Sequence, residues 1–204
     1  MKISSKTIAI TCIICLLPMI LGIIFLNRLP QDVVIHWGVN NEPNGWANKY
    51  AFVFGFPIGA AFMQLLSCAT SNTQAKGQKL PKLVMAAIWV IPIISLILYP
   101  ITILVGLGKT LDIRIIVCLI VSVIFIIFGN YLTKIPQDMN PKLMARSISD
   151  KYYKSTMKSL AIVMILSGVS LIISLFFAPM ASVLVIAISI LLILIFSLMA
   201  VFRS

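Results

Sequence analysis

Charge is scarce in this chain, and negative charge is the scarcest. Charged residues make up 10% of the 204 residues, only five residues are acidic, and histidine occurs once. Soluble domains carry about 25% charged residues. The hydrophobic fraction is 61%, which is more apolar side chain than a water-soluble fold of this length can hide. These shortages exclude an ordinary soluble domain and predict an integral membrane protein.

Catalytic and metal-binding motifs are also missing. The sequence has no HExxH or GxSxG motif and no pair of aspartates within an apolar run, so we expect neither an enzyme nor a cofactor. Four cysteines lie in or beside apolar runs with a spacing unlike zinc or redox sites, and we interpret them as packing residues: Cys12, Cys15, Cys68 and Cys118. The net charge of +11 is explained by membrane topology and anionic lipid, so no direct nucleic-acid partner is expected.

Long apolar runs set the fold class. A helix needs about 20 apolar residues to cross the hydrocarbon, and barrel strands would alternate in segments of about ten. We therefore predict an all-α integral membrane bundle of six transmembrane helices, one membrane domain over residues 1–204. The first run lacks a signal-peptide cleavage site and is expected to remain as a span. The six spans lie near residues 7–26, 50–69, 83–107, 113–132, 159–177 and 181–202.

Basic residues are unevenly shared between alternate joints. One set, which comprises both termini and the second and fourth joints, holds twelve of the 16 Lys and Arg residues. The fourth joint, residues 133–158, has six of them. The positive-inside rule predicts that this set is cytoplasmic, with both termini inside. We interpret the six basic residues as a topology signal and lipid contact, or as a docking site for a cytoplasmic protein.

Prolines interrupt the first three spans. Because proline removes a backbone donor, these helices are expected to be irregular. The joint at residues 178–180 is so short that the last two spans should form an antiparallel pair. Residues 25–33 (FLNRLPQDV) and 131–139 (YLTKIPQDM) match at four of nine positions. An inverted repeat of three plus three helices would place them on opposite sides, although a proline-polar helix exit also recurs by chance.

The outer joint, residues 27–49, concentrates the polar chemistry. It carries the single histidine, two of the three tryptophans and two of the five acids. Alternation over residues 33–37 predicts an extended segment, and residues 42–45 (EPNG) predict a turn. We expect a small folded cap at the membrane surface with Trp37 and Trp46 as interfacial anchors. His36 is interpreted as bonded within this cap, as a partner contact or as a poor metal ligand beside Asp32 and Glu42.

This joint resembles the DUF1648 domain of bacterial membrane proteins. The matching residues are Leu29-Pro30, Ile35-His36-Trp37, Glu42-Pro43-Asn44-Gly45-Trp46 and Lys49. Two positions depart from the family pattern. Val34 replaces a proline, and Asn41 replaces a glycine in a place where asparagine accepts a left-handed backbone better than most residues do.

The end of the fourth span is similar to the SdpI family. The similarity is carried by Gly129, Asn130, Tyr131 and Lys134, then by Asn140, while only Arg146 remains of the motif that follows. Independently of the family, Asn130 and Tyr131 suit helix packing and the aromatic belt at a span end.

The resemblance implies a bacterial plasma-membrane protein that gives immunity against a secreted hydrophobic peptide toxin and tethers a cytoplasmic repressor. The cap, with His36, Trp37, Glu42, Asn44, Gly45 and Trp46, would meet the toxin, and the basic joint would meet the repressor. Alternatives are a small secondary transporter or an accessory subunit of an export or regulatory system. The transporter hypothesis is weakened because the polar residues within the spans are mainly Ser, Thr and Gln64. Carriers keep ionisable groups near the middle of the bilayer.

Overall fold

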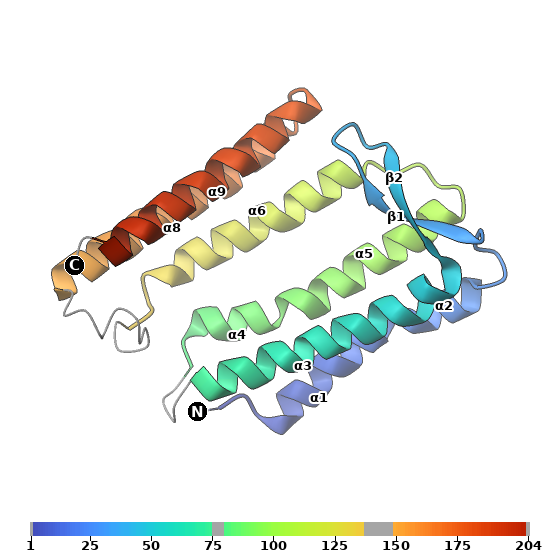
Figure 1. Ribbon diagram of the computed structural model, residues 1–204, viewed down its shortest axis with the longest axis horizontal. Coiled ribbons are helices and arrows are strands. Elements are labelled where there is room, and N and C mark those ends of the chain that lie inside the picture. The colour runs from blue at the N-terminus through green and yellow to red at the C-terminus, as the bar shows by residue number, and fades with distance from the viewer. Residues whose placement is uncertain (1, 75–79, 137–148, 203–204) are drawn as a thin grey trace. The chain divides into compact units, whose positions relative to one another are not determined.

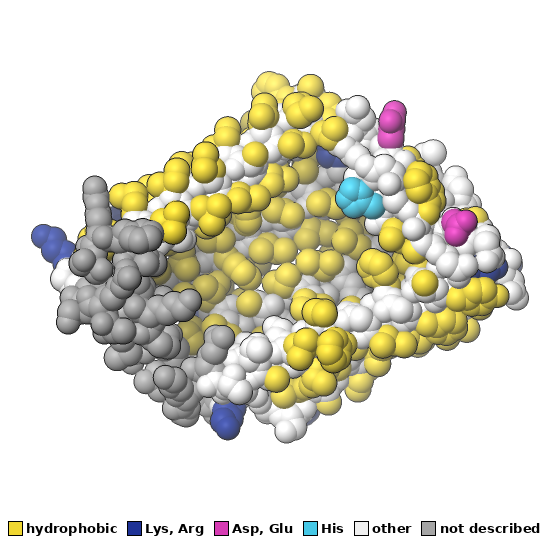
Figure 2. Space-filling model, in the orientation of Figure 1, with side chains coloured by type: hydrophobic (Ala, Val, Ile, Leu, Met, Phe, Trp, Pro, Cys, Tyr) yellow, Lys and Arg dark blue, Asp and Glu magenta, His cyan; other side chains and the backbone are white. Residues whose placement is uncertain are grey.

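A computed structural model describes residues 2–74, 80–136 and 149–202 (Figure 1). Within these residues, six helices are long and apolar enough to cross a membrane, which confirms the predicted all-α membrane fold. The chain divides into two compact units. The first consists of Met1–Leu80 with Val84–Ile113, and the second of Pro81–Leu83 with Arg114–Ser204. Figure 2 shows that apolar side chains cover much of the helix surface, as a lipid-facing protein requires.

The first unit contains three spans, each of them divided. Its elements are α1 (Ser5–Leu16), α2 (Pro18–Phe25), β1 (Asp32–Trp37), β2 (Pro43–Asn48), the π-helix η1 (Ala51–Gly55), α3 (Phe56–Gln74), most of α4 (Lys82–Ile88) and α5 (Val90–Gly106). Each division lies within a few residues of a proline, which confirms the predicted irregularity: Pro18, Pro57 and Pro92. Pro100 stays inside a continuous α5.

At each division a polar side chain from another span bonds a backbone carbonyl, and in the second and third spans that carbonyl is the one left without its helical donor. Pro57 has no N–H to bond the carbonyl of Val53 four residues earlier, and the Tyr99 hydroxyl donates to that carbonyl instead (3.1 Å). In the third span, Pro92 leaves the Ile88 carbonyl free, and Gln64 Nε2 donates to it (3.0 Å).

In the first span, the hydroxyl of Ser95 donates to the Cys15 carbonyl close to Pro18 (3.3 Å). Pro18 withholds its helical donor from the carbonyl of Ile14, one residue earlier, so this bond braces the first break from beside it. The bonds from Tyr99 and Gln64, in contrast, meet the carbonyls that the prolines leave free.

The second unit contains α6 (Ile113–Leu132, from Arg114 onward), α8 (Asp150–Ser174) and α9 (Pro179–Phe202). The predicted antiparallel pair of the last two spans is confirmed by two hydrogen bonds at opposite ends. The Tyr152 hydroxyl donates to the Met199 carbonyl (2.8 Å), and the Ser174 and Ser182 hydroxyls are bonded to each other (2.9 Å). Figure 1 shows α8 and α9 side by side.

Helix α8 begins at Asp150, nine residues before the apolar run expected near residue 159, so the loop predicted over residues 133–158 is helical in its final part. Hydropathy marks only the part of a helix that lies in lipid, and it misses a polar extension. Here the extension is stabilised by the Ser149 hydroxyl, which accepts from the Tyr152 N–H (3.3 Å), and by an ion pair between Asp150 and Lys154 (2.6 Å).

The proposed inverted repeat stays a prediction. Each unit holds three spans, as a repeat of three plus three would require. However, residues 137–139 of the second copy lie outside the described part of the chain.

Candidate functional site

The joint over residues 27–49 forms an antiparallel hairpin of β1 and β2. Val33 pairs with Ala47, Val34 with Trp46, and His36 with Gly45, and the ladder shifts on either side of His36. Val33 is fully buried and His36 is exposed. The predicted alternation is therefore confirmed for β1, with Val33 and Ile35 packed inward.

The turn does not lie at residues 42–45, and that prediction is wrong. The chain reverses over residues 38–42, where the Asn41 N–H donates to the Gly38 carbonyl (3.0 Å) and the Gly38 N–H donates to the Glu42 carbonyl (2.8 Å). Asn41 has φ 64°, the left-handed value foreseen for it.

The Pro43-Asn44-Gly45 sequence, which suggested the turn, is explained by strand pairing instead. Gly45 lies opposite His36, and a Cβ on Gly45 would stand 2.9 Å from the His36 Cβ. A glycine that permits close approach of two strands has the same sequence signature as a glycine in a turn.

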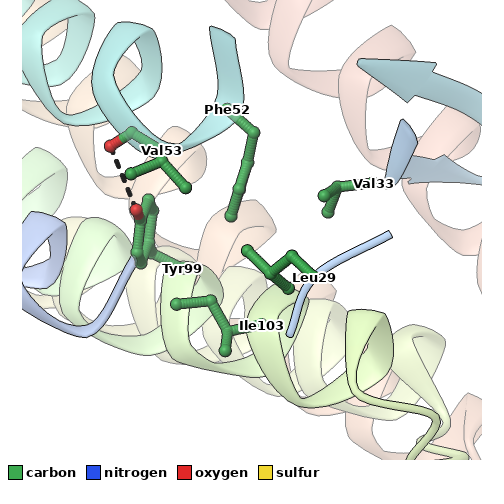
Figure 3. Close-up of a cluster of buried hydrophobic side chains, with 6 residues drawn as sticks. All are labelled: Leu29, Val33, Phe52, Val53, Tyr99 and Ile103. Carbon is green, nitrogen blue, oxygen red and sulfur yellow. Dashed lines mark hydrogen bonds between the residues drawn. The ribbon is translucent and has the colours of Figure 1, made fainter. Parts of the chain in front are cut away.

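A hydrophobic cluster holds the hairpin on the helices (Figure 3). Phe52 and Tyr99 are stacked, with ring centroids 4.6 Å apart and planes 13° apart. Two glycines let the elements approach: a Cβ on Gly106 would lie 2.8 Å from Leu29 Cδ2, and one on Gly22 would collide with the Tyr99 hydroxyl. The buried members of the cluster come from the hairpin, the segment before it, η1 and α5: Leu29, Val33, Phe52, Val53, Tyr99 and Ile103.

The Asn41 side chain fastens the turn of the hairpin to a segment 70 residues later. Its Nδ2 donates to the Leu111 carbonyl (2.9 Å), and its Oδ1 accepts from the Ile113 N–H (2.8 Å). At the other end of the first unit, Asn72 bridges the backbone of Ile3 in the same two-bond manner (2.7 and 3.3 Å). The sequence contains no local signal for either clamp.

The exposed surface of the hairpin combines an imidazole ring with a large aromatic side chain. His36 Nδ1 donates to Asn44 Oδ1 (2.5 Å), which fixes the ring and leaves Nε2 for a ligand. Trp46 is 56% exposed, Glu42 is exposed, and Trp37 is half-buried. Figure 2 shows the single histidine, in cyan, at the surface.

One family model matches this part of the chain. Residues 13–60 match DUF1648, a domain of unknown function. The DUF1648 match runs from α1 to the start of α3, so it includes the whole hairpin, Gly22, η1 and Pro57. The match ends before α5, the element that contributes Tyr99. No curated protein and no solved structure matches the chain.

The hairpin carries all six residues that were predicted from the sequence at its surface, but only three of them contact one another. His36, Asn44 and Gly45 form one contact group, while Trp37, Glu42 and Trp46 stand outside it. Among the described residues, no three of His, Cys, Asp and Glu lie close enough together to hold a metal ion. The ring of His36 is engaged within the hairpin, one of the three interpretations offered for it.

The residues that carry the SdpI resemblance, at and after the end of the fourth span, lie in the second unit, outside the DUF1648 match. Gly129 is buried, and a Cβ there would lie 2.8 Å from the Ala161 carbonyl oxygen, so α6 and α8 pack closely. Asn130 is exposed, and the ammonium of Lys134 lies over the half-buried Tyr131 ring, 4.9 Å from its centroid. The remaining two, Asn140 and Arg146, fall outside the described residues.

Proposed function

We propose that this chain is an SdpI-like immunity protein that protects a bacterium from a secreted hydrophobic peptide toxin, with the DUF1648 hairpin as the contact. The observation that carries the proposal is the contrast between the two faces of the hairpin. Val33 is buried in the hydrophobic cluster on the helices, while the side chains of His36 and Trp46 are exposed. A rigid mount with exposed aromatic and polar groups is a pre-organised binding surface.

The exposed groups suit an apolar peptide with polar backbone groups. Trp46 offers a large flat apolar surface with one N–H donor. His36 offers its Nε2, and its ring is held by Asn44, so little side-chain freedom is lost on binding. Lys49 lies 5.6 Å from the centroid of the Tyr50 ring at the base of the hairpin and adds a cation.

The signalling half of the proposal concerns the other joint. The resemblance to SdpI-like proteins implies that a cytoplasmic repressor is held at the membrane by this joint. The first turns of α8 carry Lys151, Lys154 and Lys158 as a helical basic segment, and such a segment suits an acidic protein surface. Neutralising Lys151 and Lys154 together should release a bound repressor, measured by co-purification with the membrane fraction.

Survival assays test the immunity proposal. The chain is expressed in a bacterium that is killed by a secreted hydrophobic peptide, and survivors are counted for the parent and for His36→Ala and Trp46→Ala. Both variants should lose protection at equal membrane abundance. Phe176→Ala is the matched control, because Phe176 is an exposed aromatic (86%) at the α8–α9 turn. Protection by the hairpin variants equal to that of the parent would remove the hairpin as the contact.

Transport is the second function considered, and the repaired helices argue against it. Carriers use broken helices to expose backbone groups and ionisable side chains to a substrate. Here the carbonyls of Val53 and Ile88 are occupied by Tyr99 and Gln64. Ion-coupled uptake by proteoliposomes containing the purified chain would reverse this preference, and an accessory-subunit role would show as a stable partner in mild detergent.

A further inference from the structure

A cavity of about 580 Å³ opens beside the start of α8. It lies within the second unit, between the residues that follow α6 and the first turns of α8. Its lining combines two lysines, two hydroxyl-bearing side chains and apolar groups, among them Thr133, Ile135, Tyr153, Lys154, Met157 and Lys158. Neither the DUF1648 hairpin nor the three repaired breaks contribute to it.

Two walls of the cavity are fixed by hydrogen bonds. The Tyr153 hydroxyl donates to the Ile135 carbonyl (3.1 Å), which ties the segment after α6 to α8. The neighbouring Tyr152 ties the same turn of α8 to the Met199 carbonyl of α9 (2.8 Å). The lysines of this turn are therefore displayed from a braced helix end rather than from a free loop.

The charge of the cavity favours an anion. Lys154 and Lys158 are four residues apart, which places them on the same side of α8. Asp150 also lines the cavity and pairs with Lys154 (2.6 Å), so the three side chains together carry one net positive charge. The N-terminus of α8 adds the positive end of its helix dipole next to them.

The position of the cavity indicates an amphiphilic anion. Lys158 directly precedes the apolar run that begins near residue 159, and Thr133 directly follows the last residue of α6. The cavity thus lies at the depth where lipid phosphates meet the ends of the spans. Ile135 and Met157 supply apolar contact for the glycerol region beneath a phosphate.

We propose that this cavity binds the phosphate headgroup of an anionic phospholipid taken from the surrounding bilayer. Lys158 and Lys154 hold the phosphate oxygens, Thr133 donates its hydroxyl, and the apolar lining receives the first carbons below the headgroup. The bound lipid would couple the end of α6 to the start of α8.

Native mass spectrometry of the full chain tests this inference, with phosphatidylglycerol as the anionic probe and phosphatidylcholine as the neutral one. The parent should retain phosphatidylglycerol in preference to phosphatidylcholine. Lys154→Gln combined with Lys158→Gln should lower phosphatidylglycerol retention about tenfold, and Lys158→Arg should retain it. Lys151→Gln is the matched control, since Lys151 is an exposed lysine on the same helix that does not line the cavity.

Three results would overturn the inference. Equal losses in Lys151→Gln and in the double variant would indicate diffuse attraction to the basic segment. Unchanged retention of phosphatidylglycerol in the double variant would show that Lys154 and Lys158 do not bind the lipid. Displacement of the lipid by inorganic phosphate, with phosphate bound in its place, would indicate a free-anion site. Thermal unfolding of each variant in detergent separates loss of lipid from loss of fold.

Discussion

The Tyr99 hydroxyl occupies the carbonyl of Val53 that Pro57 leaves without its helical donor. This bond joins α5 to η1 directly beneath the hairpin, and the same two residues belong to the cluster around Val33. The residues that hold the hairpin on the helices thus include the one that satisfies the free carbonyl of the second span.

Removing that hydroxyl should cost stability in a way that depends on Pro57. Tyr99→Phe keeps the stacked ring but leaves the carbonyl without this donor, so we expect a loss of about 1 kcal/mol in the free energy of unfolding. Pro57→Ala restores a backbone N–H four residues after Val53. In that background Tyr99→Phe should cost less. Thermal unfolding of the four proteins in one detergent measures the coupling, and additive effects would show that the two groups do not share the carbonyl.

Gly45 should be intolerant of even one methyl group. In Gly45→Ala the added Cβ would stand 2.9 Å from the His36 Cβ across the ladder, so the strands must separate and the amides of residues 32–48 should exchange hydrogen faster. Hydrogen exchange followed by mass spectrometry reads this out. Gly59→Ala is the control, because nothing lies within 4 Å of a Cβ at that position. Equal exchange in the two variants would contradict the close approach.

Asn41 should show a graded series. Asn41→Gly keeps the left-handed backbone (φ 64°) but loses both amide bonds to residues 111 and 113. Asn41→Ala loses the bonds and also strains the turn. The unfolding temperature should therefore fall in the order parent, glycine variant, alanine variant. Each step should lower the free energy of unfolding by about 1 kcal/mol. A glycine variant as stable as the parent would mean that the clamp contributes nothing.

The topology predicted from basic residues is open to labelling. Glu42→Cys lies at the exposed turn of the hairpin and Lys151→Cys at the exposed start of α8. A membrane-impermeant maleimide added to intact cells should label the first and spare the second, since the hairpin is expected outside. After permeabilisation both should react. The parent, whose four cysteines belong to the spans, is the background control, and the reverse pattern would invert the topology.

Much of the fold was accessible from the sequence because it depends on short-range patterns. Apolar runs of span length located the six helices, and prolines located the breaks in the first three. The alternation around Val33 and His36 indicated the extended segment. Each of these signals is contained in a few consecutive residues.

The rest depends on pairs of residues that are far apart. Nothing near Asn41 announces that its amide meets residues 111 and 113, and nothing near Gln64 announces the Ile88 carbonyl. The turn was misplaced for the same reason, because the need for Gly45 comes from the opposite strand. The start of α8 was missed because its first turns are polar and are stabilised by Ser149 and Asp150 rather than by apolar content.

The repaired breaks of the first unit also set an order for membrane insertion. All three bonds at these breaks require the third span: Ser95 and Tyr99 are its donors, and Ile88 is its acceptor. While the chain is being synthesised, the first two spans enter the bilayer with the carbonyls of Cys15 and Val53 not yet met by those partners. The first half of the protein therefore completes its folding only when α5 arrives, and until then its early helices depend on the insertion machinery or on water for their hydrogen bonds.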